Sequence, residues 1–199
     1  FRSGRELWSF SNALALLLMG VFAPFANDAL FAVVDQLLGP NTWTKPRQEG
    51  QALITFPQEE PWEIPHKTWH FDLPARGEVD SYQAVRLLGY AATVAPRGGA
   101  TLLVEGSHEL VRRMVEQSTR HDAGQSADVR RRLVGRSAWF KALTTAGGDR
   151  VDRFMTDGDE VDGVRVRVVE ATGAAGDVCF MHPWMLHNIA RNCADRPRL

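Results

Sequence analysis

Short apolar runs, separated by turns rich in glycine, proline and aspartate, dominate the chain from about residue 50 onwards. Several of these runs end at a proline, such as Pro57, Pro74 or Pro183, which cannot continue the backbone hydrogen bonding of a strand. Many short strands of this kind favour a sandwich or a barrel over a parallel sheet with crossover helices. We expect strands at 52–56, 68–73, 84–94, 100–104, 164–170 and 178–182.

Helical spacing of apolar residues replaces this pattern in two parts of the chain. Residues 28–38 fit a helix that Asn27 or Asp28 would cap and that Gly39 would end. Further along, Ser107 could cap a helix over 109–117. Ser126 could cap a second helix from 128 to about 143.

The length of 199 residues is enough for a single domain with a hydrophobic core. We expect a helical part at 1–48, strands in 49–107 and 151–199, and a helical insertion at 108–150. The fold class is therefore predicted to be mainly β with flanking helices.

Charge and composition exclude several classes of function. The formal net charge is -1, so no global charge points to nucleic acid or to an anionic membrane surface. Cys179 and Cys193 are too few for a disulfide scaffold, and a reducing cytoplasm is the simplest location. The apolar segment 13–25 is shorter than the roughly 20 residues that span a bilayer. Its length also fits the apolar region of a secretory signal, but we favour a buried helix there. Because the chain begins at Phe1 rather than Met, we expect it to be an excerpt.

His70 and Asp72 form the most informative pair of polar residues. On a strand, residues i and i+2 point to the same face, so both side chains would enter one space while Phe71 faces the other way. His187, which follows the strand at 178–182, could supply a third ligand. Two neutral imidazoles and one carboxylate are the donor set that holds non-haem ferrous iron on one face.

Other interpretations of these residues stay open. A His-x-Asp triplet occurs by chance in many proteins, and a single histidine is more often a core or surface residue. His182 is a rival for the third ligand position. Its place on a strand before Pro183 favours a core or supporting role instead.

Three stretches of the chain, in order, resemble the phytanoyl-CoA dioxygenase family. They are WHFD at 69–72, GGATLLVEGSH at 98–108, and GDVCFMHPWMLH at 176–187, the last followed by Asn192 and by RPR at 196–198. The resemblance covers roughly residues 50–199 and implies a double-stranded β-helix (jelly-roll, cupin-like) core. It also implies that the insertion at 108–150 lies near the mouth of the active site.

The resemblance further implies a set of cofactors and their ligands. Fe(II) would be held by His70, Asp72 and His187, and Arg198 would bind the distal carboxylate of 2-oxoglutarate. Thr101 is a weaker candidate for a second hydrogen bond to this cosubstrate. Arg191 and Arg196 are rivals for the role of Arg198, whose spacing from His187 matches the family.

The resemblance implies an oxidoreductase, a dioxygenase that uses Fe(II), 2-oxoglutarate and O2 to hydroxylate a small-molecule substrate with release of succinate and CO2. The carboxylate of Asp72 favours hydroxylation over halogenation, because related halogenases lack this ligand. One alternative is a metal-binding cupin-like isomerase or hydrolase, which would have no use for Arg198. Another is a non-catalytic binding module that retains the fold.

Overall fold

The computed structural model describes residues 27–45, 52–77 and 84–198, and the chain forms two compact units, 1–53 and 54–199. The described part of the first unit contains helix α2 (Asp28–Leu38). The side-chain oxygen of Asn27 accepts a hydrogen bond from the backbone N–H of Leu30 at 2.9 Å, which satisfies a free donor of the first turn. The predicted helix is confirmed, with Asn27 rather than Asp28 as its cap. The expected helix at 13–25 lies outside the described residues.

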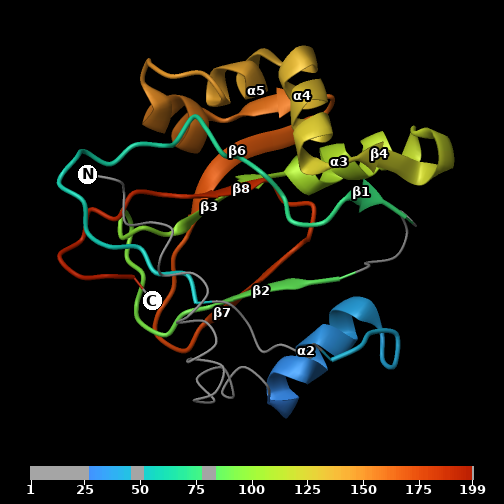
Figure 1. Cartoon of the computed structure of the whole chain (residues 1–199), viewed down its shortest axis with the longest axis horizontal. Helices are drawn as coiled ribbons and strands as arrows, with labels where there is room; N and C mark the ends of the chain where they lie inside the picture. The colour runs from blue at the N-terminus through green and yellow to red at the C-terminus, as the bar shows by residue number, and fades with distance from the viewer. Residues whose placement is uncertain (1–26, 46–51, 78–83, 199) are drawn as a thin grey trace, which may run out of the picture. The chain divides into compact units, whose positions relative to one another are not determined.

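The second unit contains a four-stranded sheet and two two-stranded sheets, all with antiparallel pairing (Figure 1). The order of strands in the four-stranded sheet is β5-β6-β3-β8, and the smaller sheets are β2-β7 and β1-β4. The bounds of the strands are β1 (Ala75–Arg76), β2 (Arg86–Gly89), β3 (Thr101–Glu105), β4 (Asp122–Gly124), β5 (Asp159–Val161), β6 (Val164–Ala171), β7 (Val178–Met181) and β8 (His187–Ile189).

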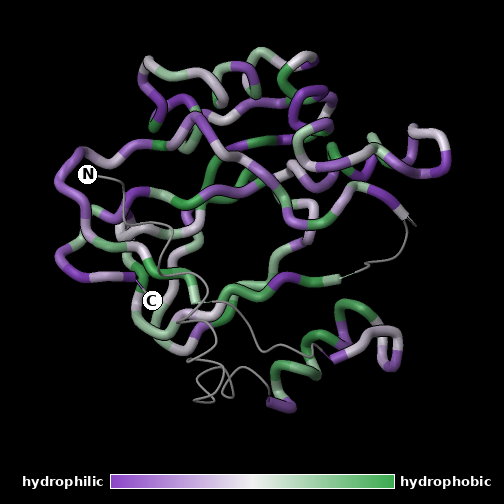
Figure 2. Tube along the Cα trace, viewed as in Figure 1, coloured by the Kyte–Doolittle hydropathy of each residue, from purple (hydrophilic) through white to green (hydrophobic). Residues whose placement is uncertain are grey.

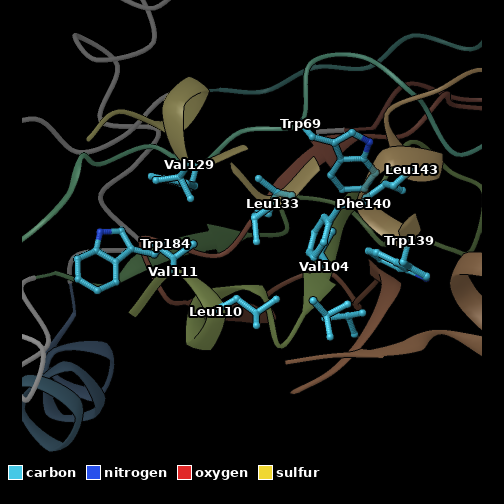
Figure 3. Close-up of a cluster of buried hydrophobic side chains, with 14 of the residues drawn as sticks. Trp69, Val104, Leu110, Val111, Val129, Leu133, Trp139, Phe140, Leu143 and Trp184 are labelled. Atoms are coloured by element: carbon cyan, nitrogen blue, oxygen red, sulfur yellow. The ribbon is translucent and has the colours of Figure 1, made fainter. Parts of the chain in front are cut away.

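Helices cover one face of the four-stranded sheet. They are α3 (Ser107–Glu116), α4 (Ser126–Arg136) and α5 (Ala138–Leu143), with a short 3-10 helix (Thr119–His121) and a π-helix (Asp152–Asp157). Figure 3 shows side chains of α3, α4 and α5 gathered around Val104 of β3. The buried residues of this main core are Ile64, Trp69, Phe71, Ala75, Leu102, Val104, Leu110, Val111, Met114, Val115, Ala123, Val129, Leu133, Trp139, Phe140, Leu143, Phe154, Val161, Val164, Val166, Val168, Trp184, Leu186 and Ala190.

The opposite face of the four-stranded sheet packs against β2 and β7. Leu103, Ala171 and Met181 are buried together there, with Leu88 and Cys179 packed against them. Figure 2 shows apolar positions along β2, β3 and β7. Leu103 is the direct cross-strand partner of His187, and partners in a ladder project to the same side of a sheet. The face that looks toward β2 and β7 is therefore the face that carries His187.

The insertion at 108–150 thus packs on the sheet face opposite to that of His187. Its buried residues, such as Val111, Leu133 and Phe140, belong to the main core with Leu102 and Val104. The resemblance to the dioxygenase family predicts this segment near the mouth of the site. Its helices instead support the sheet from behind.

Four of the expected strands are confirmed, as β2, β3, β6 and β7. The segments 52–56 and 68–73 form only isolated bridges, at Thr55 and His70. In the second case Thr68 has a positive φ of 64°, which breaks the extended conformation just before His70. Helices contribute to the fold as much as strands do, so it is mixed rather than mainly β. The sheets that are described do not close into a barrel.

The helix caps differ from those expected at two positions. Ser107 and Ser126 are the first residues of α3 and α4, whereas Gly106, at φ 78°, and Gln125 occupy the capping positions. The expected single helix over 128–143 is two helices, because Ser137 is extended and caps α5. Both misassigned serines use their hydroxyl groups elsewhere, next to the candidate site.

A search of the described residues for membrane-crossing helices finds none with the length and apolar character that a bilayer requires.

Candidate metal centre

His70, Asp72 and His187 converge on one point. Each offers one ligand atom such that all three atoms lie within 4.8 Å of one another. The carboxylate oxygens of Asp72 lie 3.9 Å from Nε2 of His70 and 3.7 Å from Nε2 of His187. The centroids of the two imidazole rings are 4.4 Å apart. The three ligands predicted from the sequence could therefore hold a metal ion together.

The backbone brings the two histidines together directly. His70 and His187 are antiparallel partners, with hydrogen bonds from His70 N to His187 O at 3.1 Å and from His187 N to His70 O at 2.8 Å. Their side chains therefore project to the same side. Phe71 is only 3% exposed and belongs to the main core on the other side, as the alternation of a strand requires.

Both imidazoles present the nitrogen that a metal needs. Nδ1 of His70 lies 2.8 Å from the carbonyl oxygen of Thr68, and Nδ1 of His187 lies 2.9 Å from that of Met185. A carbonyl oxygen only accepts, so Nδ1 is the donor in each ring, and in the neutral imidazole Nε2 then offers its lone pair to a metal. Burial is the main factor that lowers the pKa of His187, which keeps this imidazole neutral near pH 7.

The carbonyl group that orients His70 belongs to a strained residue. Thr68 is β-branched, and a positive φ at such a residue costs about 1–3 kcal/mol. Its hydroxyl group lies 3.1 Å from Oδ1 of Asn188, and Nδ2 of Asn188 donates to the carbonyl oxygen of Lys67 at 2.6 Å. The residue that follows His187 therefore fixes the turn that precedes His70.

Two helices hold the backbone beside the ligands. At the start of α4, Oγ of Ser126 accepts a hydrogen bond from Phe71 N at 3.0 Å, and Arg130 donates to the carbonyl oxygen of Trp69 at 2.6 Å. At the start of α3, Oγ of Ser107 accepts from Leu186 N at 2.8 Å and donates to the carbonyl oxygen of Val104 at 2.6 Å. These serines were expected to be helix caps, and their contacts to the ligand segments were not predicted.

His182, the rival for the third ligand position, lies in the turn that precedes His187. Its Nδ1 accepts a hydrogen bond from Trp184 N at 3.0 Å, and its ring centroid lies 5.3 Å from that of His108. Burial, together with the neighbouring His108, lowers the pKa of His182 to about 4. His182 is therefore neutral near pH 7 and supports the turn instead of joining the cluster of ligands.

An arginine that was not predicted contacts the carboxylate ligand. Nε of Arg86 on β2 donates to Oδ2 of Asp72 at 2.8 Å. The sequence does carry a signal for this residue, because Arg86 is the single charge in the otherwise apolar run at 84–94. A charged residue that interrupts an apolar strand indicates a role at a site.

Arg198 is buried, and the described residues provide no counterion for it. It is 7% exposed, and it donates to the carbonyl oxygen of Gly99 at 3.0 Å and to Oγ1 of Thr101 at 3.3 Å. Its Nε is buried with no hydrogen-bond partner, and no carboxylate of the described chain forms an ion pair with it. Burial lowers the pKa of Arg198, which reflects the cost of an uncompensated charge.

The two rival arginines are already engaged at the surface. Arg191 donates to the carbonyl oxygen of Pro61 at 2.5 Å and pairs with Glu63 at 3.5 Å. Arg196 is largely exposed and pairs with Asp195. Of the three, Arg198 is the arginine that a buried anion could neutralise.

Arg198 and the metal-binding cluster lie on the same face of the four-stranded sheet. On β3, Thr101 pairs with Ile189, and Leu103 pairs with His187. Thr101 and His187 therefore project to the same side of the sheet. They are offset by two residues, about 7 Å, along the strand direction. The hydrogen bond from Arg198 to Thr101 places the guanidinium group on this side.

No protein-family model matches the chain, and searches of curated proteins and of solved structures found no similar protein.

Proposed function

We propose that the chain is an Fe(II)- and 2-oxoglutarate-dependent dioxygenase that hydroxylates a small-molecule substrate. The observation that carries this proposal is the buried charge of Arg198, which has no carboxylate partner in the described chain and lies on the same sheet face as His70, Asp72 and His187. A bound metal would account for the cluster of ligands, and an anionic cosubstrate beside the metal would account for the buried charge of Arg198.

The donor set fits ferrous iron. Two imidazoles with free Nε2 atoms and one carboxylate make a facial triad that leaves coordination positions open. A catalytic zinc ion can also take two histidines and a carboxylate. The three ligands alone therefore do not separate an oxygenase from a cupin-like hydrolase or isomerase, and Arg198 makes the distinction.

The surroundings of Arg198 fit the far end of a keto diacid. The planar guanidinium group can bind a carboxylate through two parallel hydrogen bonds, and its buried Nε has no partner among the described residues. The hydroxyl group of Thr101 lies beside it as a further donor. A five-carbon diacid anchored here would direct its keto-acid end along β3 toward the level of His187.

Iron, when bound, would supply the activation of O2, coupled to decarboxylation of 2-oxoglutarate to succinate and CO2. The residues of the chain orient and enclose this chemistry. The carbonyl groups of Thr68 and Met185 orient the two imidazoles with Nε2 toward the metal site, and Asp72 would supply the carboxylate ligand that halogenases lack. Leu103, Ala171 and Met181 form an apolar floor that excludes water between the two sheets.

The arrangement of sheets supports a jelly-roll core. The pair β2-β7 packs against the four-stranded sheet through the cluster of Leu103, Ala171 and Met181. This antiparallel, face-to-face packing, together with the three motifs that resemble the phytanoyl-CoA dioxygenase family, supports the proposal that the second unit is a double-stranded β-helix of that family.

The test is an anaerobic titration of the iron-loaded protein with 2-oxoglutarate. Bidentate binding of the keto acid to ferrous iron should produce a weak visible charge-transfer band, and exposure to O2 with substrate should release succinate. The variant Arg198→Ala should require much more 2-oxoglutarate to produce the same band. A wild-type protein that binds iron but gives neither the band nor succinate would support the cupin-like alternative.

A further inference from the structure

Arg86 projects from β2 into the space between the two packed sheets. It pairs across the ladder with Met181, and Leu88 pairs with Cys179. Met181, Leu88 and Cys179 all belong to the cluster that faces the four-stranded sheet. Because Arg86 shares this side of β2, its guanidinium group can reach Asp72 and contacts it at 2.8 Å.

Among the described residues, few groups use the hydrogen-bonding capacity of Arg86. A guanidinium group has five N–H donors, and Arg86 uses Nε to bind Asp72, while no residue of the described chain accepts from its two amino groups. Its side chain is 50% exposed. Arg150 provides the contrast, because its guanidinium nitrogens donate to the carbonyl oxygens of Ile64, Ala142, Thr145, Pro65 and Leu143. Arg150 has the contacts of a structural arginine, whereas Arg86 retains donors for a ligand.

The charge of Arg86 would also be in excess once a metal is bound. Asp72 is its ion-pair partner in the described chain, and Asp72 would share its negative charge with a divalent ion. A carboxylate can bind the ion through one oxygen and accept from Arg86 with the other. The amino groups would then present a positive charge beside the metal, and within the described ranges Arg86 forms an ion pair with no acidic residue other than Asp72.

The neighbouring surface is apolar. Ile189 lies on the same sheet face as His187 and is 40% exposed. Leu88, two residues from Arg86 on the same side of β2, is partly buried against the cluster below. A ligand that contacts Arg86 and extends along this side of β2 would therefore place an apolar body beside Leu88.

We propose, building on the oxygenase function above, that Arg86 recognises an oxoanionic group of the substrate, a carboxylate or a phosphate ester, and that the substrate is an organic acid with an apolar body. The fork of amino groups matches either anion. Because Arg86 also contacts the metal ligand Asp72, an anion bound to Arg86 would lie beside the metal.

The test compares matched ligands that differ in charge. The full chain, loaded with Mn(II) so that no turnover occurs, is saturated with 2-oxoglutarate under nitrogen, which occupies Arg198. Hexanoate, hexyl phosphate and hexanamide are then titrated by calorimetry. We expect hexanoate or hexyl phosphate to bind about tenfold more tightly than hexanamide, which is the discrimination that one charge-assisted hydrogen bond provides.

Three variants locate the anion site. Arg86→Gln should remove the preference for the anions, whereas Arg131→Gln, which breaks an Arg–Asp pair on the surface of α4, should keep it. The ratio of affinities is the decisive quantity, because it does not depend on the fraction of protein that holds metal. Equal affinities for anion and amide in the wild type, or an unchanged preference in Arg86→Gln, would overturn the proposal.

The third variant, Arg198→Gln, separates the two hypotheses. If 2-oxoglutarate does not bind the wild type, the oxygenase proposal fails, and the same titrations on the metal-loaded protein still assess Arg86. A preference for hexanoate that disappears in Arg198→Gln but persists in Arg86→Gln would assign the anion site to Arg198. Normal 2-oxoglutarate binding without any preference for anions would reject Arg86 alone.

Discussion

Ser126 begins helix α4, yet its hydroxyl oxygen accepts a hydrogen bond from the backbone N–H of Phe71, 55 positions earlier in the chain, at 3.0 Å. Phe71 stands between the two ligands His70 and Asp72. The helix therefore fixes the peptide on which both ligands depend. Support of this kind from outside the ligand set commonly determines how well a metal site is organised.

We predict that Ser126→Ala weakens both folding and metal binding. The variant leaves Phe71 N without its partner, which should lower the free energy of unfolding by about 1–3 kcal/mol. It should also reduce affinity for Mn(II), because the ligand segment loses its anchor. Urea denaturation and calorimetric metal titration measure the two effects.

Ser137→Ala is the matched control. Ser137 caps α5 by accepting from Phe140 N at 3.3 Å, and it has no contact with the ligand segments. Its loss should cost about 1 kcal/mol of stability and leave metal affinity unchanged. Equal losses of metal affinity in the two serine variants would show that general destabilisation, and not the anchor, is responsible.

We predict that Asp72→Ala abolishes succinate release. The substitution removes the anionic ligand of the cluster, so the affinity for ferrous iron should fall and the remaining imidazoles should not hold the ion in a defined geometry. Asp195→Ala, which removes an exposed carboxylate paired with Arg196, serves as the control. Succinate release near the wild-type rate from Asp72→Ala would contradict the assignment of the triad.

We predict that Arg198→Ala raises the apparent Kd for 2-oxoglutarate by at least about tenfold, since it removes a charge-assisted contact in a buried site. The intensity of the charge-transfer band against cosubstrate concentration gives this constant. Arg196→Ala should leave it unchanged, because Arg196 is exposed. A raised Kd in Arg196→Ala with an unchanged Kd in Arg198→Ala would show that the cosubstrate does not bind on the sheet face of His187.

We predict an acid-sensitive contribution of His182 to stability. Its pKa falls from 6.5 to about 4 on folding, mainly through burial, so the unfolded chain binds more protons between these values. The contribution is fully present above about pH 6.5 and is lost as the pH falls to about 4. Over this range its loss should lower the free energy of unfolding by up to about 3 kcal/mol.

His182→Gln checks this contribution. Glutamine keeps an acceptor for Trp184 N but does not titrate, so the free energy of unfolding of the chelator-treated variant should fall less steeply between pH 6.5 and 4. Glu109 titrates at lower pH, because hydrogen bonds from Arg112 and Arg113 outweigh the opposing effect of burial and lower its pKa to about 2. Parallel curves for the wild type and His182→Gln above pH 4 would contradict the prediction.

The sequence predicted what depends on local pattern. Apolar spacing identified α2 and the strands β3, β6 and β7, and the alternation of His70, Phe71 and Asp72 predicted which side chains share a face. The segments around Thr55 and His70 were predicted as longer strands than they are. A strand extends only where a partner continues beside it, and the strained turn at Thr68 could not be read from its own sequence.

Contacts between distant segments account for the rest. A serine at the start of a helix can cap that helix or can hydrogen-bond to a distant segment. The sequence pattern predicts the cap for Ser107 and Ser126, whereas both bind the ligand segments. Arg86 reaches Asp72 only because β2 faces the four-stranded sheet, which the spacing of residues within β2 does not reveal. The insertion at 108–150 was placed by analogy, whereas its own apolar side chains determine that it packs behind the sheet.

The direct pairing of His70 with His187 gives a bound ion a mechanical role as well as a chemical one. An ion held by both rings would cross-link the edge of the sheet to a segment from the beginning of the same unit. The unfolded chain has no such preformed site, so occupancy would favour the folded state by mass action. Treatment with a chelator should therefore loosen the edge at β8 and increase amide exchange there before the rest of the unit opens.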